Sequence, residues 1–126
     1  MEAELVAAGS LDDLLASGIT ATLTLAAEHE ALAAVIDHEP ELVLPHFAFH
    51  QLGRVLALAE VLTRPHLERF LAADAVGPAA DLLARVVLTF AFRPASWVDP
   101  GDAASVRRLV GTYLLPALAS STATPA

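Results

Sequence analysis

The chain has 126 residues, which is enough for one domain with a buried core and too few for several. It contains no cysteine, which excludes a disulfide scaffold and a thiolate metal site. The formal net charge of −8 opposes nucleic-acid binding by these residues alone, because phosphate contacts need clustered Lys or Arg. Ala (27 residues) and Leu (22 residues) outnumber the β-branched residues, so we expect the all-α fold class.

Charge and hydropathy are unevenly distributed. Residues 1–53 hold nine acidic residues and no Lys or Arg, whereas all seven Arg lie from Arg54 onward. Acidic residues stand where an export signal would carry basic ones, and no run of about 18 apolar residues is uninterrupted. We therefore expect a cytoplasmic protein without a membrane span. The mean hydropathy of +0.57 implies more apolar surface than a small monomer buries, which predicts a subunit interface.

The first expected elements are a short lead helix over residues 2–8 and a longer helix over residues 11–27. Ser10 followed by Asp13 resembles a capping box at the start of the longer helix. Residues 19–25 alternate apolar side chains with Thr, which is the pattern of a half-buried strand. Both flanks are strong helix formers and no turn signal follows, so we predict helix throughout.

Proline positions mark the starts of the later helices, because proline is tolerated in the first turn, where its missing N–H costs nothing. At the last helix, Asp99 can cap the free N–H groups while Pro100 takes the first helical position. The tail over residues 120–126 is expected to be disordered. The further helices are predicted near residues 30–37, 40–62 with a disturbance at Pro45, 65–73, 78–92 and 101–119.

The last two predicted helices are apolar on more than one face. Residues 78–92 lack a polar stripe, so this helix must be covered on several sides. Gly111 inside the final helix costs about 1 kcal/mol relative to Ala, which indicates that another helix approaches closely there. We predict that these two helices pair with their copies in a second chain as a four-helix bundle.

Four stretches carry a family resemblance through their order and spacing: HEPELVLPHFAFHQ (38–51), LTRPHLERFL (62–71), LLARVVLTFAFRPASWVD (82–99) and SVRRLVGTYLLPAL (105–118). Together they resemble the C-terminal domain of TetR-type (tetracycline-repressor-like) bacterial transcriptional regulators. The resemblance implies an all-helical bundle whose last two helices build a homodimer and whose cavity receives a small, often hydrophobic effector. It assigns residues 1–9 to the remnant of a connecting helix and residues 10–119 to the ligand-binding and dimerisation domain.

The resemblance also implies an interface and sets a limit. Members of the family carry a helix-turn-helix segment before this region; none precedes Ser10, so we expect DNA to be reached only through an absent N-terminal domain. The helix beginning near Ser10 would transmit the effect of the ligand. The expected dimer interface consists of Leu82, Arg85, Val86, Thr89, Arg108, Leu109, Gly111 and Leu115.

Aromatic side chains at helical spacing are the candidates for the effector pocket. Small-molecule sites are commonly apolar cavities that contain one or two polar groups. We hypothesise that Phe49, His50, Phe70 and Phe90 line this pocket, with His46 or His50 as the orienting polar group. The sequence thus predicts the effector-binding domain of a regulator that senses a small hydrophobic ligand.

Two alternatives remain at this stage. The chain could be a dimerisation or scaffold module that binds no ligand. It could also be a metal-binding helical protein, because His46 and His50 stand i,i+4 with His38, Glu39 and Glu41 nearby. A third ligand at diagnostic spacing is missing, so no metal or other cofactor is assigned. The sequence also offers no Cys or Lys nucleophile and no Gly-rich phosphate loop, so we expect no enzyme activity.

Overall fold

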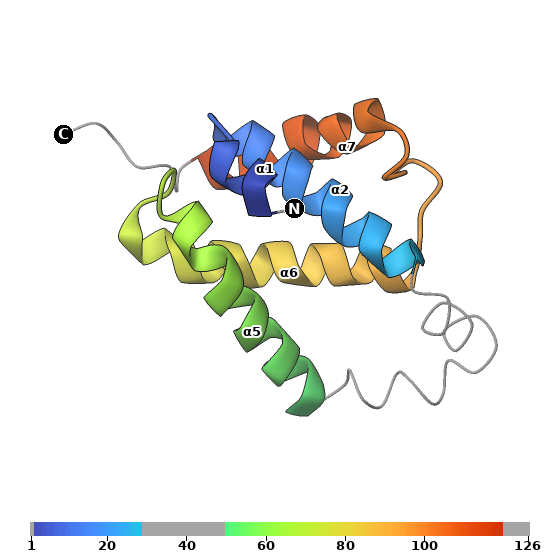
Figure 1. Cartoon of the computed structure of the whole chain (residues 1–126). Coiled ribbons are helices and arrows are strands. Elements are labelled where there is room, and N and C mark those ends of the chain that lie inside the picture. The colour runs from blue at the N-terminus through green and yellow to red at the C-terminus, as the bar shows by residue number, and fades with distance from the viewer. Residues whose placement is uncertain (1, 29–49, 120–126) are drawn as a thin grey trace.

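The computed structural model describes residues 2–28 and 50–119, and over these ranges it is all-helical with no strand (Figure 1). The predicted all-α class is therefore confirmed. The helices are α1 (Glu2–Ala7), α2 (Leu11–Glu28), α5 (His50–Leu67), α6 (Val76–Phe92), α7 (Ala103–Leu109) and α8 (Leu115–Leu118). A 3-10 turn, η1 (Ala73–Ala75), precedes α6, and a π-helical turn, η2 (Val110–Leu114), joins α7 to α8.

Helix α2 lies at the centre of the fold. It packs against α1, α6, α7 and η2, and α5 packs against α6. In Figure 1, α2 and α6 run one over the other, with α7 beside α2 and α5 crossing α6. Their buried side chains form one apolar core, whose most deeply buried members are Val76, Val106 and Val110.

The start of α2 agrees with the predicted cap. The Asp13 backbone N–H donates to Ser10 Oγ at 3.1 Å, which satisfies one of the free donors of the first turn. The alternating segment is helical, because Ile19 and Leu23 stand one turn apart and both enter the core. Thr22 donates to the Gly18 carbonyl oxygen at 2.8 Å within the helix. Tertiary burial at a spacing of four residues thus overrides the strand-like alternation.

Pro65 does not mark a helix start as predicted, whereas Pro78 lies in the first turn of its helix. Pro65 lies inside α5, which ends at Leu67, so the expected break between residues 62 and 65 and the helix over 65–73 are wrong. Pro65 is exposed and stands in the last turn of α5. Because Pro65 has no N–H, the Val61 carbonyl lacks its helical donor, and water can solvate it there. Pro78 is the third residue of α6, within the first turn where proline is tolerated. The expected helix over 30–37 lies outside the described residues.

The start of α7 is also displaced from the prediction. Asp102, not Asp99, is the N-cap, and it accepts the Ala104 N–H at 3.1 Å. Asp99 instead accepts the Gly101 N–H at 2.8 Å, in a turn ahead of the helix. The buried Ser105 hydroxyl accepts from the Asp99 N–H at 2.9 Å and so fixes this turn against α7. The helix therefore begins at Ala103.

The final segment is helical but not one regular helix. At η2 the Leu115 N–H bonds to the Val110 carbonyl oxygen, a spacing of five residues. The wider turn has a local cause, since Pro116 has no N–H to donate and its ring would collide with the Thr112 carbonyl of a regular α-helix. No described atom outside the local helix backbone lies within 4 Å of a Cβ built on Gly111. No other described helix of this chain therefore approaches Gly111 closely, and the predicted approach of a helix from a second chain stays a prediction.

One stretch of the described residues, Ala73–Phe92, is long and apolar enough to cross a membrane by length and composition. A single such stretch is weak evidence for a span, because core helices of soluble proteins share these properties. Its centre carries an ion pair, with Arg85 Nε 2.8 Å from Asp81 Oδ2. Hydrogen bonding to Asp81 raises the pKa of Arg85, so the guanidinium stays charged.

Candidate functional site

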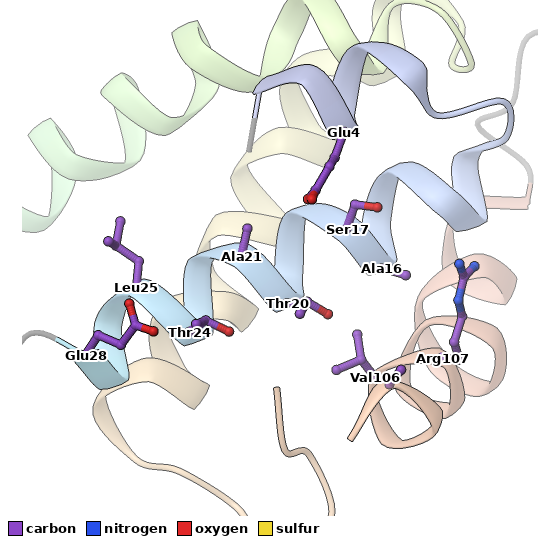
Figure 2. A pocket seen from close by; sticks show the side chains of 11 residues that line it. Glu4, Ala16, Ser17, Thr20, Ala21, Thr24, Leu25, Glu28, Val106 and Arg107 are labelled. Atoms are coloured by element: carbon purple, nitrogen blue, oxygen red, sulfur yellow. The ribbon is translucent and has the colours of Figure 1, made fainter. Parts of the chain in front are cut away.

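An open groove of about 520 Å³ lies between α1, α2 and α7 (Figure 2). Helix α2 forms most of its wall, α1 supplies one carboxylate, and α7 supplies the opposite side. We call it the α2 groove. Its lining consists of Glu4, Ala16, Ser17, Thr20, Ala21, Thr24, Leu25, Glu28, Ala103, Val106 and Arg107.

Hydroxyl groups are the main polar feature of the α2 wall. Ser17, Thr20 and Thr24 follow a spacing of three and four residues, which places them along one side of the helix. They lie away from Ile19 and Leu23, which enter the core. The three hydroxyls have no hydrogen-bond partner among residues 2–28 and 50–119. They are therefore available to a molecule in the groove.

Arg107 closes one end of the α2 groove and ties α7 to the first turn of α2. Its Nη1 atom lies 2.9 Å from Asp13 Oδ1 and 3.1 Å from Asp12 Oδ1. The hydrogen bond to Asp13 is the main cause that raises the pKa of Arg107. Two carboxylates thus balance this single cation, and the guanidinium is already engaged within the protein.

Two further carboxylates border the α2 groove. Figure 2 shows Glu4 pointing from α1 toward Ser17, and Glu28 beside Leu25 at the last turn of α2. Both are exposed, and neither forms an ion pair with the described part of the chain. Because Arg107 is neutralised by its own partners, the groove as a whole carries a negative charge.

A second groove, of about 540 Å³, lies between α1 and α5. Its lining consists of Val6, Val61, Leu62, Pro65, His66 and Arg69. We call this the α5 groove. Arg69 holds its two sides together, because its guanidinium donates to the backbone carbonyls of Leu5 at 3.0 Å and of Ala8.

The apolar side chains around the α5 groove face outward. Val6, Leu58, Val61 and Leu62 have between 59% and 68% of their surface exposed. Leu58 and Leu62 stand one turn apart on α5, and Val6 adds to the same region from α1. These exposed apolar side chains make the surface around the α5 groove a candidate interaction region.

Of the sequence-predicted pocket residues, only Phe70 and Phe90 have side chains that the structure describes, and these two lie apart. Phe70 lies before the amino end of α6 and Phe90 near its carboxyl end, and 17 helical residues span about 25 Å. The Arg69 guanidinium lies over the Phe70 ring, with Arg69 Cζ 4.9 Å from the ring centroid. His46 and Phe49 lie outside the described residues. His50 begins α5, and its side chain is likewise outside the described part.

Phe90 instead belongs to an aromatic cluster at the carboxyl end of α6. Its ring centroid is 5.6 Å from that of Trp97, in an edge-on arrangement. Trp97 in turn lies 5.8 Å from Tyr113 of η2. Trp97 and Tyr113 are 46% and 58% exposed, so the cluster is open to solvent on one side.

The expected interface residues occupy mixed environments. On α6, Leu82, Arg85 and Thr89 are exposed and Val86 is partly buried. Nearer the carboxyl end of the chain, Arg108 and Gly111 are exposed and Leu115 is partly buried. Leu109 differs from these residues, since it is 3% exposed and packs in the core of the single chain. Leu109 therefore presents almost no surface to a second chain.

No group of three or more His, Asp or Glu side chains that could hold a metal ion occurs within the described ranges. The candidate ligands His38, Glu39, Glu41 and His46 fall in residues 29–49, outside those ranges.

Sequence reasoning did not identify the α2 groove. The signal was present in the alternating segment, where Thr20 and Thr24 stand four residues apart on a helix whose apolar residues face elsewhere. Reading that segment as a helix with a hydroxyl face would have predicted a polar site beside α2. Comparison with known proteins adds no assignment: no family model, no curated protein and no solved structure matches this chain.

Proposed function

We propose that this chain is the effector-binding and homodimerisation domain of a TetR-type transcriptional regulator, and that it acts without catalysis. The resemblance of its sequence supports the class. The observation that carries the proposal is the position of the α2 groove, which joins the lead helix α1 to the closing helix α7 across the central helix α2.

A molecule in this groove would contact three helices at once. The lining includes Glu4 from α1, Thr20 and Thr24 from α2, and Ala103 from α7. Binding shifts a conformational equilibrium only through different affinities for its two states. An occupant that fits one distance between α1 and α7 better than another therefore favours one orientation of α1 relative to α2 and α7. In the proposed regulator, a DNA-reading domain attached ahead of α1 would move with it.

The groove is suited to binding rather than to bond breaking. No histidine belongs to the part of its lining that the structure describes, so no imidazole base stands beside its hydroxyls among those residues. Its exposed apolar side chains, Leu25 on α2 and Ala103 on α7, offer contact area for a hydrophobic effector.

The homodimer of this proposal uses the exposed side of α6 and the aromatic cluster. Leu82, Trp97 and Tyr113 are 43–58% exposed, although large apolar and aromatic residues are usually covered. Trp and Tyr are also the residue types that contribute most to protein interfaces. We place the centre of the dimer contact at Leu82 and the Trp97–Tyr113 pair.

A thermal-shift screen of the full chain against small compounds with a hydrophobic body, both uncharged and charged, tests the ligand part. A binder raises the melting temperature by mass action. Ala21→Phe fills the α2 groove and should remove that shift, whereas Leu62→Phe in the α5 groove should leave it unchanged. The ligand assignment fails if no compound stabilises the chain, or if Leu62→Phe alone removes the shift.

The exposed apolar surface around the α5 groove favours a second candidate function. A scaffold or interaction module would use Leu58, Val61 and Leu62 to hold a macromolecular partner, and it would need no small ligand. In that case the screen gives no stabilised complex, and substitutions on α5 change association while substitutions on α2 do not.

A further inference from the structure

The α2 groove combines negative charge with unpaired hydroxyl acceptors, and this combination restricts the chemistry of its occupant. Its cation, Arg107, is engaged by Asp12 and Asp13 at 3.1 and 2.9 Å. Glu4 and Glu28 have no ion-pair partner within residues 2–28 and 50–119. A groove bordered by carboxylates concentrates cations and repels anions.

The two free carboxylates stand toward opposite ends of the groove. Glu4 points toward Ser17, which is eleven residues before Glu28 on α2 (Figure 2). Eleven residues of α-helix span about 16 Å. An occupant that satisfies both carboxylates is therefore elongated and carries a positive charge at each end.

The hydroxyls between these ends add a further requirement. The oxygens of Ser17, Thr20 and Thr24 can accept hydrogen bonds, and no described residue donates to them. An ammonium group is a strong donor without acceptor capacity, so inner nitrogens along the occupant would match this stripe. The methylene groups between nitrogens would lie against Leu25 and Ala103.

Resting on the proposed function of this groove as an effector site, we propose that its ligand is a linear aliphatic polyamine. The terminal ammonium groups bind Glu4 and Glu28, and the inner ammonium groups donate to the hydroxyls of α2. The effector is thus an amphipathic cation rather than a neutral hydrophobic compound.

Calorimetric titration of the full chain with spermine at low ionic strength tests this proposal. Dodecanediamine is the matched probe, because it has the same number of chain atoms between its terminal nitrogens and lacks the inner ones. Dodecanedioate has similar length and opposite charge. We expect spermine to bind more tightly than dodecanediamine and the dicarboxylate not to bind.

Variants locate the contact. Glu4→Gln and Glu28→Gln should each weaken spermine binding by up to about fivefold, the upper end for exposed charge pairs. Thr20→Val with Thr24→Val should weaken spermine about tenfold, because the hydrogen bonds lost are to charged groups. The same pair should change dodecanediamine binding little. Asp74→Asn is the control, since it removes one exposed negative charge between α5 and α6, away from the groove.

Three results would overturn the proposal. Spermine gives no binding heat, or Asp74→Asn weakens it as much as Glu4→Gln, or spermine and dodecanediamine bind equally and respond equally to the Thr substitutions. If neutral hydrophobic compounds bind and lose affinity in Ala21→Phe while spermine does not bind, the effector site stands and the polyamine assignment fails. If neither class binds, both fail.

Discussion

The two grooves of this molecule are nearly equal in size, about 520 and 540 Å³, but they differ in chemistry. The α2 groove is bordered by two carboxylates and by the hydroxyls of α2, whose other side enters the core. The α5 groove is bordered by aliphatic side chains that are mostly exposed. The two grooves therefore differ in the groups that they offer to a partner and not in their volume.

The largest expected difference between the two regions concerns stability. Ile19 on α2 is 4% exposed, and Ile19→Ala should reduce the free energy of unfolding by about 2–5 kcal/mol. Val61 on α5 is 68% exposed, and Val61→Ala should change it by less than about 0.5 kcal/mol. Urea denaturation of both variants provides the measurement. A large loss from Val61→Ala would mean that α5 is covered in solution.

Substitutions on α6 and on α5 should differ in their effect on dimerisation. Leu82→Arg places a charge in the proposed dimer contact and should weaken dimerisation by at least about tenfold, since a buried unpaired charge is costly. Leu58→Arg makes the same change on α5 and should leave the dimer intact. Sedimentation velocity over a concentration series distinguishes them. The reverse pattern would move the interface to the α5 surface.

Glycine substitutions provide a finer comparison of α2 with α5. A Cβ at Gly18 would lie 3.6 Å from Leu5 Cδ2, an ordinary contact, and a Cβ at Gly53 would meet no described atom within 4 Å. Both Gly→Ala changes should stabilise their helices by up to about 1 kcal/mol. Thermal unfolding checks this result. Destabilisation by Gly18→Ala alone would show that α1 packs more tightly on α2 than the structure has it.

The smallest expected effect is electrostatic. Arg107→Gln removes the ion pairs between α7 and the first turn of α2, and it should lower the melting temperature slightly at low salt and less at high salt. Because folding raises the pKa of Arg107, the pair stabilises the fold below the unfolded pKa and loses this effect only at strongly alkaline pH. Melting curves at two salt concentrations test the first statement. Salt-independent destabilisation would point to lost packing instead.

The regular parts of the fold were predictable from sequence because they depend on local signals. The Ser10 cap, the continuous α2 and the long apolar α6 follow from capping chemistry and helix propensity. The predictions failed where one local signal had two structural solutions. Pro65 can start a helix or stand in its last turn, and either Asp99 or Asp102 can cap α7.

The candidate site was less predictable, because it depends on how helices distant in sequence pack. Phe70 and Phe90 both suit an apolar pocket, but the length of α6 separates them. Arg107 meets Asp12 and Asp13 across 94 residues of sequence, which no periodicity could indicate. The hydroxyl face of α2 has a signal in the sequence, but the alternation of Thr with apolar residues over residues 19–25 is also the pattern of a strand.

Light scattering by the full chain over a dilution series tests the central claim most directly, because a regulator domain of the proposed kind works as a pair. The account predicts a molar mass twice that of the 13.2 kDa chain down to about micromolar concentration. A mass equal to one chain at about 100 micromolar would contradict it.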